Sequence, residues 1–393
     1  MSPTKKLFLL TIFCLPLYLN KILFKGLNFN VLDFLALISI FVFLTTHNKQ
    51  TVFAFIKRNK SLFAASFLLF GGLLFSWFLN SPSISGLGII ISWFALPFLF
   101  SLFGSILLKN LNETVHFLLV FYFSATVVSV VALVYKMLGI MTYDNRLSAF
   151  FDSPNQLAMF LAPSIFIGSS LLFKKCFASY ARLIYLTLPI ILLASYFTFS
   201  YGNWFAIFFS FCVLFLMQRN LFTKKQLWLF LVIIFVFSLF FSSQFSNQKF
   251  QAVFQKNPHS SLASREMIWS SSTKIITDHF FAGIGPGNFQ KQYLAYQKYF
   301  PPYLEWAVPE PHNVYLAFWL QTGLVGLIGF IFLLILVFRK IFQNKNASLA
   351  FLGFFVYFAV YGLIDTPYWK NDLAYLFWLF TFLSFGNFTQ KNS

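Results

Sequence analysis

The sequence predicts an all-α polytopic membrane protein with about twelve transmembrane helices and one long extramembrane loop before the tenth. Of its 393 residues, 59% are hydrophobic and only 10% are charged, whereas soluble domains carry about 25% charged residues. Apolar runs of the roughly 20 residues needed to span a bilayer recur along the chain. These runs do not alternate apolar and polar residues, so they indicate helices rather than the strands of a membrane barrel.

Each expected helix is an apolar run bounded by charged or turn-forming residues. Lys5 and Lys6 precede the first run without a small-residue cleavage site behind it, which favours an uncleaved helix over a signal peptide. Residues 1–243 hold the expected helices 7–23, 31–46, 61–79, 84–108, 114–138, 155–173, 180–199, 204–217 and 226–243. Residues 244–311 form the long loop with amphipathic helices, and residues 312–393 hold the helices 312–338, 347–364 and 372–388.

The net charge of +18 does not indicate a nucleic-acid partner, because the basic residues gather on one side of the predicted membrane. The loops on that side hold most of the lysines and arginines and a single acid, Glu113. Cytoplasmic loops of membrane proteins carry such an excess of positive charge. Both termini are therefore expected in the cytoplasm and the long loop on the outer side.

No charged residue falls in the middle of an expected span, and this argues against an ion-coupled transporter. Polar residues such as Gln321 leave a transport path open as an alternative. The polar and charged residues that could carry chemistry gather instead at the outer face; they are Arg146, Asp152, Arg265, Glu266, Asp278, Glu305, Glu310, His312, Asp365, Lys370 and Asp372.

His312 is the sharpest catalytic candidate. It follows Pro309-Glu310-Pro311, where the loop ends and the tenth helix begins. The positive end of the helix dipole favours a neutral imidazole there, and a neutral imidazole can accept a proton near pH 7. The alternative is a polar cap at a membrane boundary.

Arg265 opens a probable amphipathic helix, 263–279, that would lie along the outer membrane surface. Its guanidinium can hold a phosphate through two parallel hydrogen bonds. The alternative is a surface arginine among lipid headgroups. Arg146, in the outer loop 139–154, could supply a second positive charge, or it could simply be a loop residue.

The run Gly283-Ile284-Gly285-Pro286-Gly287-Asn288-Phe289 offers unobstructed backbone amides, as anion-binding nests do. It matches neither a dinucleotide-binding nor a Walker fingerprint, and a plain turn is the alternative. Asp365, Lys370 and Asp372 form a small charged loop that is expected to be a solvated connector, and Asn155 is expected to cap the sixth helix.

Neither a metal site nor a disulfide framework is predicted. His259, His279 and His312 have no metal-ligand spacing. The cysteines lie in or beside apolar runs at unrelated spacings, as free thiols do; they are Cys14, Cys176 and Cys212. We expect no cofactor.

Three segments together resemble the O-antigen ligase and polymerase superfamily of bacterial inner-membrane glycosyltransferases. The first is Arg146-Leu147-Ser148-Ala149-Phe150 with Ser153-Pro154-Asn155-Gln156. The second is Arg265-x-x-x-Trp269, an aspartate–histidine pair and the glycine-rich run 283–289. The third is Pro311-His312-Asn313-Val314-Tyr315-Leu316 with Gln321-Thr322-Gly323-Leu324-Val325-Gly326.

The resemblance implies a metal-independent enzyme that moves a glycan from undecaprenyl diphosphate to an acceptor at the periplasmic face of the inner membrane. In ligases the acceptor is a sugar of the lipid A core. His312 matches the family's proposed base and Arg265 a diphosphate ligand. The expected residues that bind diphosphate and glycan are Arg146, Tyr201, Gly285, Gly287, Asn288 and Asn313.

One departure from the family concerns Ser200-Tyr201-Gly202, where many members have Ser-Arg-Gly. Tyrosine can donate one hydrogen bond but brings no charge, so Arg146 is the expected substitute. We predict an O-antigen ligase. The alternative is an O-antigen polymerase that joins lipid-linked repeats; a polysaccharide or lipid transporter is less favoured.

Overall fold

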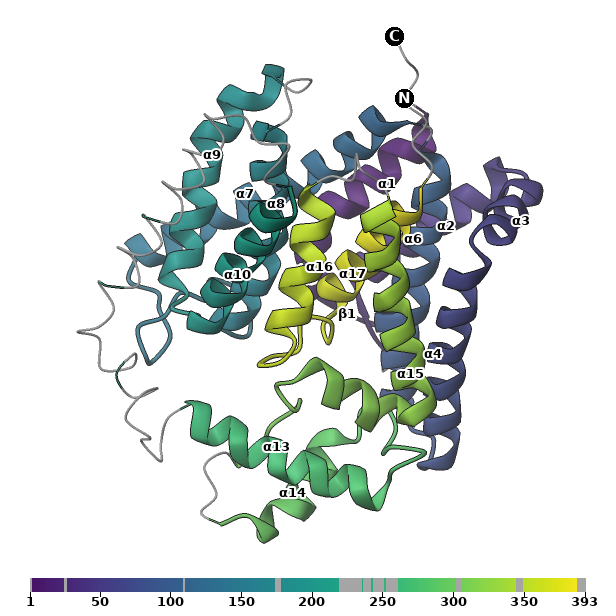
Figure 1. Cartoon of the computed structure of the whole chain (residues 1–393), viewed down its shortest axis with the longest axis vertical. Coiled ribbons are helices and arrows are strands. Elements are labelled where there is room, and N and C mark those ends of the chain that lie inside the picture. Colours follow the sequence, from purple (N-terminus) through teal and green to yellow (C-terminus); the bar gives the residue numbers. More distant parts are fainter. Residues whose placement is uncertain are drawn as a thin grey trace.

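Helices lying side by side make up most of the molecule (Figure 1). The computed structural model describes residues 2–24, 27–108, 110–173, 178–218, 261–301, 306–343 and 349–386, and the single residues 235, 242 and 251. The predicted ninth helix, 226–243, lies outside these residues except at residues 235 and 242. The α-helices are α1 Pro3–Phe13, α2 Val31–Thr46, α3 Lys49–Arg58, α4 Lys60–Leu79, α5 Ile84–Ile89, α6 Leu96–Leu107, α7 Leu111–Met137, α8 Pro154–Phe173, α9 Ala178–Phe197, α10 Tyr201–Gln218, α13 Ser261–Asp278, α14 Phe289–Tyr296, α15 Val314–Gln343, α16 Leu349–Tyr361 and α17 Asn371–Phe385.

Most predicted helices occur with ends close to those expected from the sequence. α17 lies at the centre, where the side chains of Phe377, Trp378 and Phe380 are fully buried. It packs against α6 and α15, while α16 packs against α8 and α10. A helix that is apolar on all sides belongs inside a bundle, and this agrees with the near-continuous apolar sequence of α17.

The N-terminal region differs from the single helix predicted over 7–23. α1 ends at Phe13, a 3₁₀ helix covers Leu15–Leu19, and the strands β1 (Lys21–Phe24) and β2 (Leu27–Asn30) pair antiparallel. Proline explains the early end, because Pro16 cannot donate a backbone hydrogen bond to continue the helix. The all-α prediction is corrected to this extent.

The basic inner loop predicted before the third helix contains α3, whose axis is bent by 105° from that of α2. Val52 and Phe55 pack against the core, while the side chain of Phe53 is 68% exposed. Lys57 and Arg58 lie in its last turn. An apolar side and a basic end are typical of a helix at a membrane surface.

Six helices among the described residues are long and apolar enough to cross a membrane, or seven if α2 and α3 form one bent span. Two further apolar helices, Tyr201–Met217 and Leu349–Tyr361, are shorter. These findings identify a multi-pass membrane protein. The prediction of about twelve spans is not confirmed by helix length.

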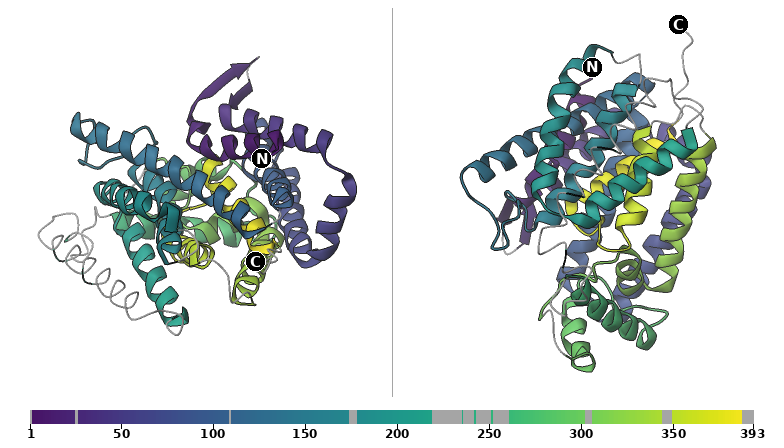
Figure 2. Two further views of the ribbon diagram at one scale, coloured as in Figure 1. Left: turned by 90° about the horizontal axis from the view of Figure 1, so that it is seen from above. Right: turned by 60° about the vertical axis from the view of Figure 1, so that its left-hand side comes forward.

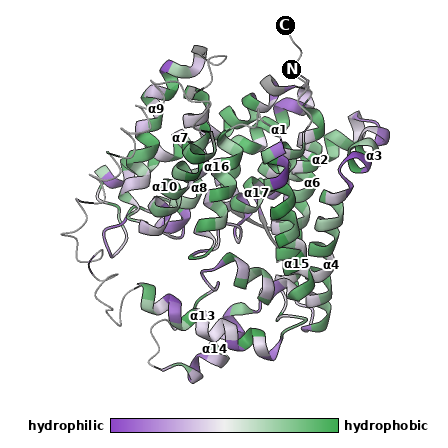
Figure 3. Cartoon of the chain, viewed as in Figure 1, coloured by the Kyte–Doolittle hydropathy of each residue, from purple (hydrophilic) through white to green (hydrophobic). Residues whose placement is uncertain are grey.

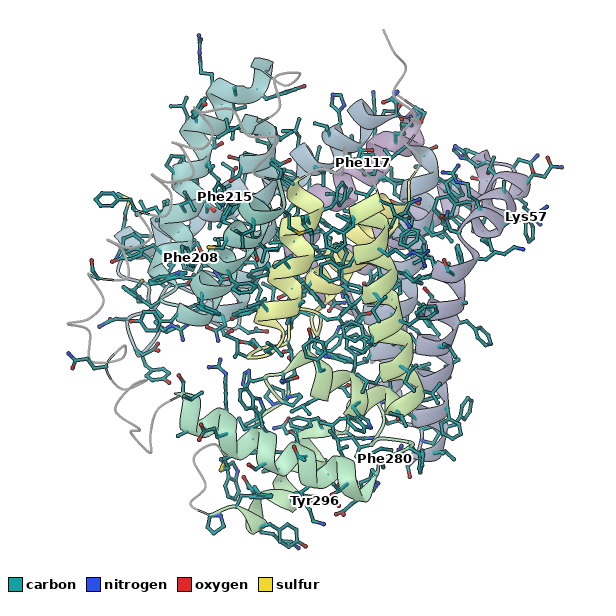
Figure 4. The ribbon with its side chains drawn as sticks, viewed as in Figure 1. Lys57, Phe117, Phe208, Phe215, Phe280 and Tyr296 are labelled. Carbon is teal, nitrogen blue, oxygen red and sulfur yellow. The ribbon has the colours of Figure 1, made fainter. Side chains whose placement is uncertain are left out.

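The predicted division of charged residues between two sides of a membrane stays a prediction. Lys5 and Glu113, both assigned to the inner side, form an ion pair of 2.6 Å. Figures 1 and 2 place α13 and α14 at the end of the molecule opposite the beginning of α1. Hydrophilic residues occur on α3 and around α13 and α14 (Figure 3), and Figure 4 labels Lys57 and Tyr296 far apart on these two regions.

α15 is not one straight helix. Gly323 has φ 67° and ψ −177°, which breaks the helix into a short arm, residues 314–322, and a long arm, residues 324–343. The long arm packs closely against α4, because a Cβ on Gly72 would lie 2.2 Å from the Gly326 nitrogen. Small residues at such a crossing let two membrane helices approach.

The glycine-rich run 283–289 holds this break in place. The backbone N–H of Ile284 donates to the Leu320 carbonyl at 2.6 Å, and that of Leu324 donates to the Phe281 carbonyl at 3.0 Å. Gly283 has a positive φ of 64°, and a Cβ there would lie 2.4 Å from the Leu320 oxygen. The run therefore forms a joint with the broken helix that begins two residues after His312.

Replacing Gly323 with alanine should destabilise this joint. Its backbone conformation is essentially restricted to glycine, and a Cβ would lie 2.5 Å from the Phe281 oxygen. We expect Gly323→Ala to cost at least about 1–3 kcal/mol, measured as a lower thermal unfolding midpoint in detergent. Gly71→Ala is the matched control, because a Cβ at Gly71 meets nothing within 4 Å. Equal midpoints for the two variants would contradict the strained joint.

Candidate functional site

Asp365 lies at the centre of the candidate site and joins two groups that are distant in sequence. His312, just before α15, places its Nδ1 3.1 Å from Asp365 Oδ1. Arg265, in the first half of α13, places Nη2 3.6 Å from Asp365 Oδ2. The imidazole and the guanidinium predicted from the sequence therefore meet at one carboxylate.

The loop between α16 and α17 buries this carboxylate, whose side chain is only 4% exposed. Tyr361 donates its hydroxyl to Asp365 Oδ2 at 3.2 Å, and Asn155 donates its side-chain amide to the same oxygen at 3.0 Å. Burial alone would raise the pKa of Asp365, but His312 and Arg265 lower that pKa well below its ordinary value. Asp365 is therefore ionised at neutral pH.

The same loop is anchored to the membrane bundle through Tyr368. Its hydroxyl donates to the Trp93 carbonyl at 2.7 Å, within a π-helical turn, Ile90–Ala95. Pro97 follows four residues after Trp93 and has no N–H for an α-helical bond to this carbonyl. The π turn and the proline thus supply a backbone acceptor that fixes the Asp365 loop.

His312 is held in an uncommon backbone conformation, with φ 47°. Asn313 caps α15, since its Oδ1 accepts from the N–H groups of Tyr315 and Leu316 at 3.0 Å each. The Trp269 indole donates to the His312 carbonyl at 3.3 Å. Because His312 Nδ1 faces Asp365 and 34% of the side chain is exposed, Nε2 is the ring nitrogen left for substrate.

The spacing of Arg265 and Trp269 now has a structural explanation. Residues four apart lie on the same face of a helix, so one face of α13 supplies both the guanidinium near Asp365 and the indole bonded to His312. The spacing of Arg265 and Trp269 in the sequence does not by itself predict that both side chains serve one site.

The two arginines differ in how many of their donors are already used. Arg146 donates Nε to the Thr198 carbonyl at 2.7 Å and Nη2 to Asn155 Oδ1 at 2.6 Å. Burial lowers its pKa, and the nearby carboxylate of Asp144 opposes that change. Among the described residues, Arg265 Nε is buried without a hydrogen-bond partner. Arg265 is therefore the arginine with donors to offer a ligand.

The other predicted binding residues lie in different places. Tyr201 begins α10, three residues after the Thr198 carbonyl that Arg146 binds, and packs edge-on against Trp204. The Asn288 side chain donates to the Ile284 carbonyl, and the Gly287 N–H donates to Gln321 Oε1 at 3.4 Å. Gly285 lies against the end of α4. These contacts form the joint with α15, and diphosphate binding there stays a prediction.

Two expectations about outer loops need correction. Asp365 is buried and contacts several side chains of the site, so it is not part of a solvated connector. Asn155 does not cap α8: the Gln156 N–H donates to Ser153 Oγ at 3.2 Å, which leaves Asn155 to link Arg146 with Asp365. Neither role has a local sequence signal, because the partners lie far apart in the chain.

No group of three or more His, Cys, Asp or Glu side chains suited to a metal ion occurs among the described residues. His259 lies outside them.

A family model described as O-antigen ligase matches residues 176–331. This match supports a place for the chain in the O-antigen ligase and polymerase superfamily. This confirms the resemblance drawn from the sequence. No curated protein matches the chain.

The O-antigen ligase match includes Tyr201, Arg265, the glycine-rich run and His312. Arg146 and Asp365 lie outside the matched residues, although the structure brings both to the same cluster. Members of this family are glycosyltransferase-like enzymes, and the family implies lipid-linked glycan substrates.

Proposed function

We propose that this protein is an O-antigen ligase that transfers a polysaccharide from undecaprenyl diphosphate to a sugar hydroxyl of the lipid A core. The reaction takes place at the periplasmic face of the bacterial inner membrane and needs no metal or other cofactor. The observation that carries the proposal is the convergence of His312 and Arg265 on Asp365, within a chain that matches the ligase family.

His312 is the base. With Nδ1–H donating to Asp365, the lone pair on Nε2 can take the proton of the acceptor hydroxyl. The acceptor oxygen then bonds to the anomeric carbon while the bond from that carbon to the diphosphate oxygen breaks. Asp365 fixes the tautomer and stabilises the imidazolium that forms. The proton ends on His312, and undecaprenyl diphosphate leaves with the bonding electrons.

Arg265 stabilises the departing diphosphate. Its side chain, 20% exposed, is held near Asp365, and its guanidinium can donate to a phosphate oxygen. The buried guanidinium of Arg146 adds a second fixed positive charge behind it. Tyr201 lies on the Arg146 side of this cluster, where its hydroxyl donates one hydrogen bond to the lipid-linked glycan substrate.

The test uses the purified protein in proteoliposomes with an undecaprenyl-diphosphate glycan and lipid A-core. Laddered lipopolysaccharide with release of undecaprenyl diphosphate is the expected product. Longer lipid-linked chains without attachment to lipid A-core would instead identify an O-antigen polymerase. The family match is common to both activities and does not separate them. If neither product forms, the transferase proposal is rejected.

A further inference from the structure

The segment before α15 is tied to the loop after α16 at a second point beside His312. Thr366 donates its hydroxyl to the Glu310 carboxylate. Its backbone N–H donates to Asp365 Oδ1 at 2.9 Å, and this is the same oxygen that faces His312 Nδ1. One threonine therefore connects the carboxylate that orients the base with a carboxylate two residues before the base.

This second contact is half-buried. Thr366 is 2% exposed. Burial raises the pKa of Glu310, while the ammonium of Lys370 and the Thr366 hydroxyl oppose that change. The Lys370 ammonium also lies 3.6 Å from Asp152 Oδ2, in the outer loop that carries Arg146. Losing one partner of a buried hydrogen bond leaves the other unsatisfied, so this contact is costly to break.

We propose that Glu310 and Thr366 are positioning residues that keep the His312 imidazole against Asp365. The assignment rests on the proposed function. Pro309 and Pro311 restrict the backbone on both sides of Glu310, and His312 follows with a positive φ. In so constrained a segment, the Glu310–Thr366 contact decides where the ring of His312 lies. A displacement of about 1 Å at a reacting group can lower a rate on the order of 10²-fold.

The test compares paired variants in the full-length protein. Glu310→Ala and Thr366→Val remove the hydrogen bond, and each should lower kcat by roughly 10- to 100-fold with little change in KM. Glu310→Gln and Thr366→Ser keep an acceptor and a donor, and each should stay within about threefold of the parent protein. Asp278→Asn is the matched control: this exposed outer carboxylate contacts Lys274 and Tyr296 on the other side of α13.

A pH profile separates positioning from loss of folded protein. The charged groups facing His312 are Asp365, Glu310 and, through Asp365, Arg265. Thr366→Val keeps all these charges but loosens the contact between His312 and Asp365 that stabilises the protonated base. The acid limb of kcat/KM should therefore move to lower pH. Loss of folded protein would instead lower the rate equally at every pH.

Three results would overturn the assignment. The first is parent-like kcat in both Glu310→Ala and Thr366→Val. The second is a loss in Glu310→Gln equal to that in Glu310→Ala, which would show that the charge matters and not the hydrogen bond. The third is an unshifted acid limb in Thr366→Val. A parent protein that transfers no glycan would reject the proposed function instead.

Discussion

His312→Ala is expected to lower glycan transfer on the order of 10²–10⁴-fold, the usual contribution of a general base. Without the imidazole, the acceptor hydroxyl must attack while it still holds its proton. Binding of the lipid-linked donor should change little, because the arginines of the site remain. The measurement is the initial rate of lipopolysaccharide formation in proteoliposomes, together with KM for the donor.

The backbone of His312 calls for a second variant. Its φ of 47° is unfavourable for alanine, whereas asparagine adopts it readily. His312→Asn should therefore keep the backbone conformation and the thermal midpoint of the parent protein, yet lose as much activity as His312→Ala. Parent-like turnover in a folded His312→Asn protein would remove His312 from the mechanism.

Asp365→Asn is the second substitution for which we expect a large loss of glycan-transfer rate. The neutral amide can neither stabilise the imidazolium nor hold the required tautomer, so the rate should fall on the order of 10²–10⁴-fold. The pKa of Asp365 lies well below its ordinary range in the folded protein, so this residue stays ionised near neutral pH. Because the amide no longer stabilises a protonated base, the acid limb of kcat/KM should lie at lower pH in the variant than in the parent protein.

Thermal unfolding of Asp365→Asn and of the parent protein, measured at two pH values, provides the control for this variant. Because the folded-state pKa of Asp365 is lowered, its ionisation stabilises the protein above the ordinary carboxyl pKa and loses that effect as pH falls through the folded-state pKa. Asp365→Asn should thus unfold at a lower temperature than the parent at pH 7, with a smaller difference in strong acid. A variant as active as the parent at pH 7 would refute the role of Asp365.

The positions of most helices followed from the sequence because long apolar runs have few other structures in a bilayer. α2 and α4 begin and end within one residue of the predicted limits. The departures are local backbone events. Pro16 ends α1 early, and Gly323 breaks α15 where a partner loop supplies hydrogen bonds. The sequence shows the residue that permits a break but not the partner that stabilises it.

The candidate site was predictable in part. His312 and Arg265 stood out because charged or titratable groups next to apolar runs are costly and therefore informative. Asp365 did not, because its loop is short, polar and ordinary in composition. Its role depends on residues such as Asn155, which is 210 positions away in the chain. Contacts of that range come from the packing of helices, which no local pattern encodes.

α4 extends beyond the loop that carries Asp365 (Figure 1), and this bears on how much water reaches the site. Phe78 and Leu79 are 64% and 60% exposed at the far end of α4, so apolar surface suited to lipid tails continues past the level of the site. Lipid tails against this apolar surface would keep bulk water away from it. The activated sugar should then meet far fewer water molecules than in a site open to the periplasm. Hydrolysis of the lipid-linked glycan should therefore be slow compared with its transfer to the acceptor.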